Sequence, residues 1–362
     1  MNKPSYADFD PAAKFQAIQS IIASKLTRYP KAICSYSGGS DSDTMLDLIE
    51  RTRQVFGLKP VKYVFFNTGL EMEATKRHVK EIPEKYGVDI ETIRPKRNIV
   101  LATREHGLPI FSKIFSFAFE DIQRKNIPLS VVKEYKQCET VTEKQKKFTE
   151  LVEIFKRADV IAYICSCDRK GVPAENQLSL SSYPFLLDFA LENPPKFKIS
   201  KRCCDECKKK PAHEAQKGFD LITTGERFYE GGLRSTSVSG CFNEQANGQF
   251  RLRPLFFVTD SDKVWYKERY GLRYSDAYEV YGMKRTGCCG CSISARAVED
   301  LEIIGQYEPK LKKAAWAVFG DAYRYRQQYV EYRDRRRKEE KEERESVLNA
   351  WKPYLEEVSE NV

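Results

Sequence analysis

The sequence has no apolar run that approaches the roughly 20 residues needed to cross a bilayer. Residues 1–6 include no apolar signal region. We therefore expect a cytoplasmic protein with no membrane partner. Histidine is also scarce, since His78, His106 and His213 are the only three, and their spacing is not that of metal ligands. A structural role is predicted for each of them.

Cysteine, by contrast, is abundant up to Cys291 and absent after it. The chain has 11 cysteines, an odd number that disulfide pairing explains poorly in a reducing compartment. Cys165 and Cys167 have no assigned role, and the more isolated cysteines are predicted to be ordinary buried or surface residues. Six cysteines lie in two tight groups, which indicates metal or redox chemistry. These are Cys203, Cys204, Cys207, Cys288, Cys289 and Cys291.

The size and charge of the chain set broad limits on its function. Its 362 residues suffice for a sizeable core and one or two domains. The formal net charge of +9 suits anionic ligands such as nucleotides or nucleic acid but does not distinguish between them. The sequence gives no indication of the oligomeric state.

Strand and helix patterns alternate along the first 95 residues. Asp10-Pro11 is a helix-start signal, with Asp10 as the predicted cap. Buried strands are predicted at 32–36, 61–66 and 88–93, and helical patterns fill the intervals between them. This alternation is typical of an α/β fold, in which helices cover both faces of a parallel, twisted sheet. Such sheets bind ligands at the carboxyl ends of their strands. A loop rich in glycine and serine follows the first strand at once.

The rest of the chain is predicted to complete this domain and to extend it. Residues 1–295 form the predicted nucleotide-binding domain, with an irregular insertion at about 111–197 and a helical C-terminal extension at 296–362. Later signals include a strand at 219–223 and a capping box from Thr259 to Asp262, with Gly271 ending the helix. The mixed charges of residues 331–345 favour a solvated helix with i,i+4 ion pairs over a nucleic-acid arm.

The glycine-rich loop has the composition of a phosphate-binding loop. A turn between a strand and a helix presents free backbone N–H groups at the positive end of the helix dipole. Glycine lets the backbone approach a phosphate closely, and serine adds hydroxyl donors. Asp41 is negative, so we expect it to cap the helix or to help hold a cation. The loop consists of Ser37, Gly38, Gly39, Ser40, Asp41 and Ser42.

Ser-Gly-Gly-x-Asp-Ser resembles the pyrophosphate loop of N-type ATP pyrophosphatases and phosphoadenosine phosphosulfate (PAPS) reductases. Further matches follow in order, covering about 31–95 and about 200–310. Asn67-Thr68-Gly69 is similar to the family's Asp-Thr-Gly segment, with Asn67 in place of the aspartate. Gly225-Glu226-Arg227 with Arg234 is similar to its Gly-x-Arg-x-x-Glu-Ser-x-x-Arg segment, with Gly231 in place of the serine. Residues 285–291 resemble its Arg-Thr-Gly-Cys-x-Gly-Cys signature.

The resemblance implies an adenine nucleotide alpha-hydrolase-like fold and an adenine nucleotide ligand. The phosphates are expected on the loop, and the adenosine near Asn67, Thr68 and Gly69. Arg227 and Arg234 are candidate anion ligands near Gly225, because a guanidinium pairs with phosphate or sulfate in a bidentate way.

The resemblance also implies a [4Fe-4S] cluster bound by Cys203, Cys204, Cys288 and Cys291. Cys207 or Cys289 could replace one of these ligands. A zinc site made of two Cys-x-x-Cys pairs, 204–207 and 288–291, is the alternative.

The reductases of this family attack sulfur with a cysteine near the C-terminus, and this chain has none after Cys291. We therefore expect ATP to be cleaved at the α-phosphate to adenylate a substrate in sulfur-related chemistry, with Mg²⁺ on the phosphates. Asp41, Arg227 and Arg234 are the predicted catalytic residues. A nucleic-acid substrate and a sulfur-donor protein are candidate partners, because the chain also resembles the DndC-type enzymes of DNA phosphorothioation. Two alternatives stay open: an APS or PAPS reductase with a displaced cysteine, and a non-catalytic nucleotide or redox sensor.

Overall fold

The computed structural model describes residues 5–174, 179–230 and 240–360. The chain divides into two compact units, each built from segments that are distant in sequence. Unit 1 comprises Met1–Ala102, Cys203–Cys291 and Val298–Val318, and unit 2 comprises Thr103–Arg202, Ser292–Ala297 and Phe319–Val362. The predicted C-terminal extension is thus divided between the two units.

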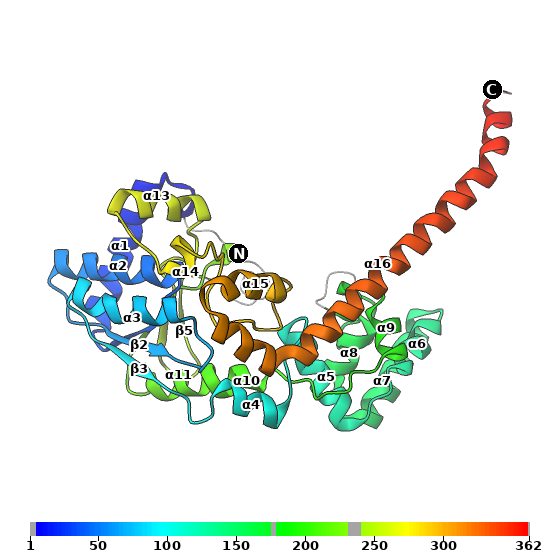
Figure 1. Ribbon diagram of the computed structural model, residues 1–362, viewed down its shortest axis with the longest axis horizontal. Coiled ribbons are helices and arrows are strands. Elements are labelled where there is room, and N and C mark those ends of the chain that lie inside the picture. Colours follow the sequence, from blue (N-terminus) through cyan, green and yellow to red (C-terminus); the bar gives the residue numbers. More distant parts are fainter. Residues whose placement is uncertain (1–4, 175–178, 231–239, 361–362) are drawn as a thin grey trace. The chain divides into compact units, whose positions relative to one another are not determined.

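Unit 1 is built on a six-stranded sheet in the order β3-β2-β1-β4-β6-β5; Figure 1 labels β2, β3 and β5 of this sheet. All neighbouring strands pair in parallel except β5 and β6, which are antiparallel. The α/β fold class with a parallel sheet is therefore confirmed, and β5 adds an antiparallel edge. The strands are β1 (Ala32–Tyr36), β2 (Lys62–Phe66), β3 (Ile90–Ile93), β4 (Leu221–Thr223), β5 (Phe242–Glu244) and β6 (Phe250–Leu252).

Helices cover both faces of this sheet, as predicted. Because successive side chains of a strand point to opposite faces, Cys34 and Tyr36 of β1 join a large core with the first helices, whereas Ile33 joins a small cluster packed by Ala215. The helical segments wholly or partly in unit 1 are η1 (Ser5–Asp8), α1 (Pro11–Arg28), α2 (Ser40–Phe56), α3 (Glu73–Tyr86), α4 (Ile99–His106), α10 (Arg202–Cys204), η3 (Asp205–Lys209), α11 (Lys210–Ala215), η4 (Phe228–Glu230), α13 (Asp260–Tyr270), α14 (Asp276–Glu279) and α15 (Ala297–Tyr307).

Local sequence signals set the ends of these helices. Asp10 accepts a hydrogen bond from the Ala13 amide at 3.1 Å and caps α1. Thr259 and Asp262 form the predicted capping box of α13, and Gly271 ends that helix with φ of 61°. These three predictions are confirmed, because each depends on residues only a few positions apart.

Unit 2 is a helical body with its own core, and it contains the segment at about 111–197 that the sequence predicts as an irregular insertion. Phe115, Phe119 and Ile122 recur at helical spacing on one buried face, and Tyr325 and Tyr329 from the C-terminal helix join the same core. Its elements are α5 (Lys113–Lys125), α6 (Ser130–Gln137), α7 (Val141–Phe155), α8 (Ala158–Cys165), η2 (Leu180–Ser182) and α9 (Leu186–Glu192), and α16 (Pro309–Glu360) extends into it.

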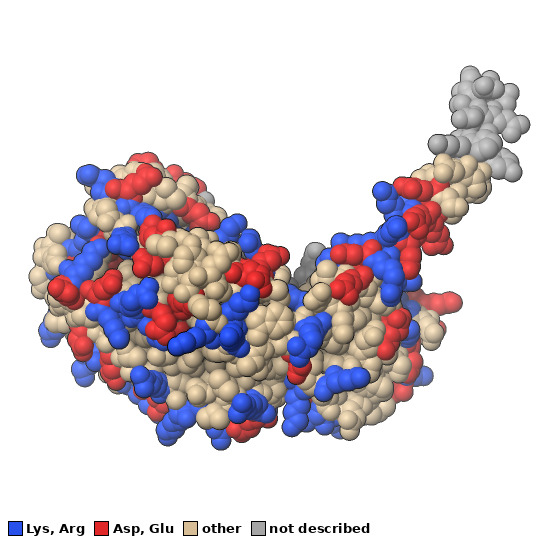
Figure 2. Space-filling view, viewed as in Figure 1, with Lys and Arg blue, Asp and Glu red and all other residues tan. Residues whose placement is uncertain are grey.

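The charged part of α16 is the predicted solvated helix. Arg335 pairs with Glu339, and Lys341 pairs with Glu345, in each case one turn apart. Acidic and basic side chains alternate along this stretch (Figure 2). Among the described residues, no helix combines the length and the apolar character that a membrane span requires.

Candidate functional site

The predicted phosphate loop joins β1 to α2, as the sequence indicates. The Gly39 amide donates to Ser42 Oγ at 3.0 Å, and this hydroxyl donates to the Gly39 carbonyl at 2.7 Å. Gly39 is the N-cap of α2 and the Ser42 side chain pairs with its backbone, so Asp41 takes no part in this cap, which was one of the two roles expected for it. The cap is local to the turn and leaves the Asp41 side chain available for other contacts.

Glycine is required at two positions of this loop. Gly38 has φ of 67°, and a Cβ added there would lie 2.8 Å from Cγ2 of Thr75 on α3. A Cβ on Gly39 would lie 2.9 Å from Oγ1 of Thr286. The loop backbone is therefore packed closely between α3 and the segment that precedes the second cysteine group.

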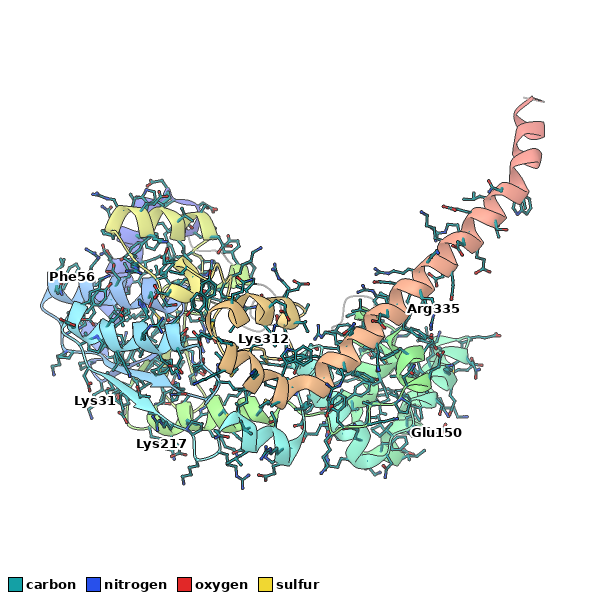
Figure 3. All side chains as sticks on the ribbon, viewed as in Figure 1. Lys31, Phe56, Glu150, Lys217, Lys312 and Arg335 are labelled. Carbon is teal, nitrogen blue, oxygen red and sulfur yellow. The ribbon has the colours of Figure 1, made fainter. Side chains whose placement is uncertain are left out.

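The loop borders a cavity of about 420 Å³ at the carboxyl ends of β1 and β4. Strand order reverses between these strands, and open α/β sheets bind ligands at such a switch point. In Figure 3, Lys31 before β1 and Phe56 at the end of α2 lie on one side of unit 1, so the loop between these elements lies toward the other side. The cavity is lined by Ser35, Ser37, Gly39, Ser40, Asp41, Ser42, Gly225, Glu226, Arg227, Tyr229, Asp260, Lys263, Tyr278, Lys284, Arg285 and Thr286.

Charged side chains in this cavity are held by one another. Arg227 Nε lies 2.9 Å from Asp41 Oδ1, and its Nη2 lies 2.8 Å from Asp260 Oδ1. Arg227 Nη1 also donates to the Val258 carbonyl at 3.1 Å, which fixes the guanidinium plane. Lys263 Nζ lies 2.5 Å from the same Asp41 oxygen. One carboxylate thus holds two cations at the edge of the phosphate loop.

The structure brings together most, but not all, of the predicted nucleotide-binding residues. The loop, Gly225 and Arg227 meet at the cavity, whereas Arg234 lies outside the described residues. The Asn67–Gly69 segment does not line this cavity. Thr68 Oγ1 there donates to Glu71 at 2.8 Å and lies 3.4 Å from Cys288 Sγ. The segment expected to bind adenosine therefore borders the cysteine groups.

Sequence reasoning missed several cavity residues. Arg285 and Thr286 belong to the Arg-Thr-Gly-Cys-x-Gly-Cys match and Lys284 precedes it, but no ligand role was assigned to them. Lys263 gave no motif signal, because its helix was interpreted only as a structural element. Its position in the first turn of α13 after a capping box was the one available clue.

The two cysteine groups come together in unit 1. The pKa of Cys203 is raised by its hydrogen bond with Cys204, by burial, and by the nearby Cys291 and Cys288 thiols. The amide of Cys289 donates to the Leu70 carbonyl at 2.7 Å, which anchors the second group to the loop after β2. Residues more than 80 positions apart in sequence therefore form one thiol-rich region.

A lysine lies within this thiol-rich region. Burial lowers the pKa of Lys208, but Cys288, Glu71 and Cys204 outweigh burial and raise the pKa. A charged ammonium beside thiols favours their thiolate form, which is the form that binds metals.

The cysteine groups supply the donors that either predicted metal group requires. Within residues 5–174, 179–230 and 240–360, no three His, Cys, Asp or Glu side chains converge as ligands of one metal ion. The Cys207 thiol donates to the Arg97 carbonyl at 3.3 Å. Thiolates bind both zinc and iron–sulfur clusters, so the donor chemistry fits either group. The ligand set Cys203, Cys204, Cys288 and Cys291 stays a prediction.

A buried polar network supports the phosphate loop from α3. Asp43, one residue beyond the loop, accepts from Tyr36 and lies 3.0 Å from His78 Nε2. The Asp43 amide donates to the Gly39 carbonyl at 2.9 Å. Burial lowers the pKa of His78, but the hydrogen bond and charge of Asp43 outweigh burial, so the pKa of His78 is raised. The structural role predicted for this histidine is consistent with this network.

The raised pKa of His78 predicts that stability falls with rising pH. When the pKa of a histidine is higher in the folded than in the unfolded state, its protonation stabilises the fold. This contribution to the unfolding free energy is fully present below the unfolded pKa of about 6.5. This contribution is lost as pH rises through the folded pKa. Chemical denaturation of the wild type from about pH 6 to pH 9 should show the loss, and His78→Gln should remove it. His213→Gln, at an exposed position, is the control, and parallel curves for the wild type and His78→Gln would contradict the prediction.

Comparison with known families agrees with the loop motif. The model of the phosphoadenosine phosphosulfate reductase domain family matches residues 31–124, which include β1, the loop and α2. The resemblance predicted from Ser-Gly-Gly-x-Asp-Ser is therefore confirmed over this part of the chain. The matched family is one of enzymes that act on a nucleotide. No curated relative matches the chain.

Several solved structures are similar to this chain at low identity. A phosphoadenylyl-sulfate reductase from Candida auris, in a phosphate complex, is 15% identical with a TM-score of 0.38, over 78% of this chain and 90% of that one. The U34-tRNA thiolase NcsA from Methanococcus maripaludis, with its [4Fe-4S] cluster, is 12% identical with a TM-score of 0.34; the match covers 88% of this chain and 80% of that one. FMN adenylyltransferase from Candida glabrata, in complex with ATP, is 12% identical with a TM-score of 0.36; the match covers 78% of this chain and 66% of that one.

Proposed function

We propose that this protein binds ATP or a related adenine nucleotide in the cavity beside the phosphate loop and adenylates a substrate. One observation carries this proposal: the loop and four cationic side chains border a single cavity at the switch point of the sheet. The cations are Arg227, Lys263, Lys284 and Arg285. A cavity of about 420 Å³ lies within the usual size range of small-molecule sites.

In the proposed step, an oxygen of the acceptor attacks the α-phosphorus of ATP. The bond from that phosphorus to the bridging oxygen breaks, and pyrophosphate leaves with the electron pair. The proton of the acceptor hydroxyl passes to solvent. Backbone N–H groups of the loop, together with Arg227 and Lys263, stabilise the charge that accumulates on pyrophosphate. Arg234 is proposed to act with them.

Two further groups belong to the proposal. Mg²⁺, when bound to the phosphates, would neutralise part of their charge, and Asp41 is the carboxylate of the loop that can hold it. A [4Fe-4S] cluster on Cys203, Cys204, Cys288 and Cys291 would supply a redox-active centre for sulfur-related chemistry. The proximity of the two cysteine groups and the lysine beside them support this assignment.

Product analysis tests the proposed reaction. The protein, purified without oxygen and analysed for iron and zinc, is incubated with ATP and Mg²⁺, with and without nucleic acid as acceptor. We expect pyrophosphate release, together with AMP or an adenylated acceptor. ADP and phosphate alone would contradict cleavage at the α-phosphate. Binding of ATP without turnover would indicate a sensor, and sulfite release from PAPS with thioredoxin would indicate a reductase.

A further inference from the structure

Lys263 contacts the phosphate loop, although no motif in the sequence predicts this contact. Its Nζ lies 2.5 Å from Asp41 Oδ1 and 2.9 Å from Ser40 Oγ. The side chain is only 12% exposed, although it borders the cavity. An ammonium in this position faces the place where the loop is proposed to hold phosphate.

The helix that carries Lys263 is fixed to the helix that carries the loop. Tyr266 of α13 donates to Asp47 of α2 at 2.8 Å. Asp262, the neighbour of Lys263, pairs at 2.6 Å with Lys14 of α1, and both side chains are buried. Contacts with α1 and α2 therefore hold the Lys263 backbone in place beside the loop. A ligand that binds there meets a cation whose position is already set, which lowers the entropy cost of binding.

In the structure, the Asp41 carboxylate is the negative charge that pairs with the Lys263 ammonium. Its Oδ1 faces both Lys263 and Arg227, so the carboxylate occupies the two cations that an anionic ligand would use. Phosphate oxygens could replace the carboxylate on both cations. Asp41 would then be free for a divalent cation that enters with the phosphates, since carboxylate is a preferred ligand of Mg²⁺.

We propose that Lys263 is a phosphate-binding residue and that Asp41 holds it until a phosphate ligand arrives. This inference rests on the proposed function, because it assigns the pyrophosphate part of the ligand to the same cavity. It adds a residue from α13 to a phosphate site that the sequence placed on the segments after the predicted strands at 32–36 and 219–223. It also gives Asp41 a role before the ligand binds.

Calorimetric titration of the full chain with inorganic pyrophosphate, with and without Mg²⁺, tests the role of Lys263. Lys263→Met should weaken binding by about tenfold or more, whereas Lys263→Arg should keep most of the affinity, because the positive charge is retained. Lys267→Met is the matched control. Lys267 lies one turn further along α13, pairs with Glu279 and borders no part of this cavity, so its loss should change affinity less than about twofold.

The role of Asp41 is tested by Asp41→Asn in the same titrations. Loss of the internal carboxylate should tighten binding of metal-free pyrophosphate and reduce the benefit of Mg²⁺. Unchanged or weaker metal-free binding would overturn the holding role.

Two outcomes separate the inference from the proposed function. If the wild type binds ATP and pyrophosphate, and a folded Lys263→Met variant binds them equally well, only the Lys263 assignment fails. Equal losses in Lys263→Met and Lys267→Met would overturn it as well. If the folded wild type binds neither ligand, the proposed function itself fails. Circular dichroism and the melting temperature of each variant show whether it is folded.

Discussion

A Ser37→Ala, Asp41→Ala double variant is expected to lose release of pyrophosphate from ATP. Ser37 borders the cavity, and its hydroxyl donates to Ser42 Oγ at 3.1 Å, within the cap of α2. Asp41 is the candidate holder of Mg²⁺ and positions Arg227 and Lys263. Removal of one group that stabilises transition-state charge typically costs about 10²–10³-fold in rate. Loss of the Ser37 hydroxyl, together with the carboxylate that would hold Mg²⁺ and that positions two cations, should lower turnover by about 10³-fold or more.

A matched double variant controls for nonspecific damage. Ser20→Ala, Asp89→Ala removes the same two residue types at exposed positions in unit 1 that border no part of the cavity. It should release pyrophosphate at nearly the wild-type rate. If Ser37→Ala, Asp41→Ala is folded and still turns over ATP, the assignment of the phosphate loop is wrong.

A Lys14→Met variant is expected to lose about 3–5 kcal/mol of unfolding free energy, because it leaves a buried carboxylate without its partner. Lys14 Nζ lies 2.6 Å from Asp262 Oδ2, and the two side chains are only 5% and 6% exposed. Asp262 also accepts from the Thr259 amide at 2.8 Å as part of the cap of α13. Urea or guanidinium denaturation measures the change.

The same pair predicts a specific loss of stability in acid. Burial raises the pKa of Asp262, but Lys14 and Thr259 outweigh burial, so the pKa is lowered. A carboxylate with a lowered folded pKa stabilises the protein above its unfolded pKa of about 3.9, and this contribution is lost as pH falls through the folded pKa. The unfolding free energy of Lys14→Met should therefore fall less than that of the wild type as the pH is lowered.

Two comparisons make the Lys14 prediction decisive. Lys62→Met, whose partners Asp89 and Glu91 are exposed, should cost less than about 1 kcal/mol. A Lys14→Met, Asp262→Asn double variant should recover part of the loss, because the unpaired charge is removed. Equal costs for Lys14→Met and Lys62→Met would contradict the importance of burial.

The sequence alone was sufficient wherever the relevant forces act over a few residues. The apolar run of β1, the glycines after it and the helical pattern of α2 together predicted the strand, loop and helix that the structure contains. The caps at Asp10 and Thr259 were predicted because the donors and acceptors lie within one turn. The middle region gave no clear pattern in the sequence, because the helices of unit 2 are short and their stability comes from shared burial rather than from strong individual patterns.

The composition of the cavity required tertiary structure. Local sequence identified the loop at 37–42, the Arg227 segment and the two cysteine groups as separate features. The fold decided that Lys263 meets Asp41 and that the Asn67–Gly69 segment borders Cys288 instead of the cavity. The physical reason is that parallel strands bring together the segments that follow them according to strand order, and order in the sheet differs from order in the chain. The sequence therefore indicated which segments are candidates for binding phosphate or metal, and the sheet decided which of them lie together and which further side chains, such as Lys263, join them.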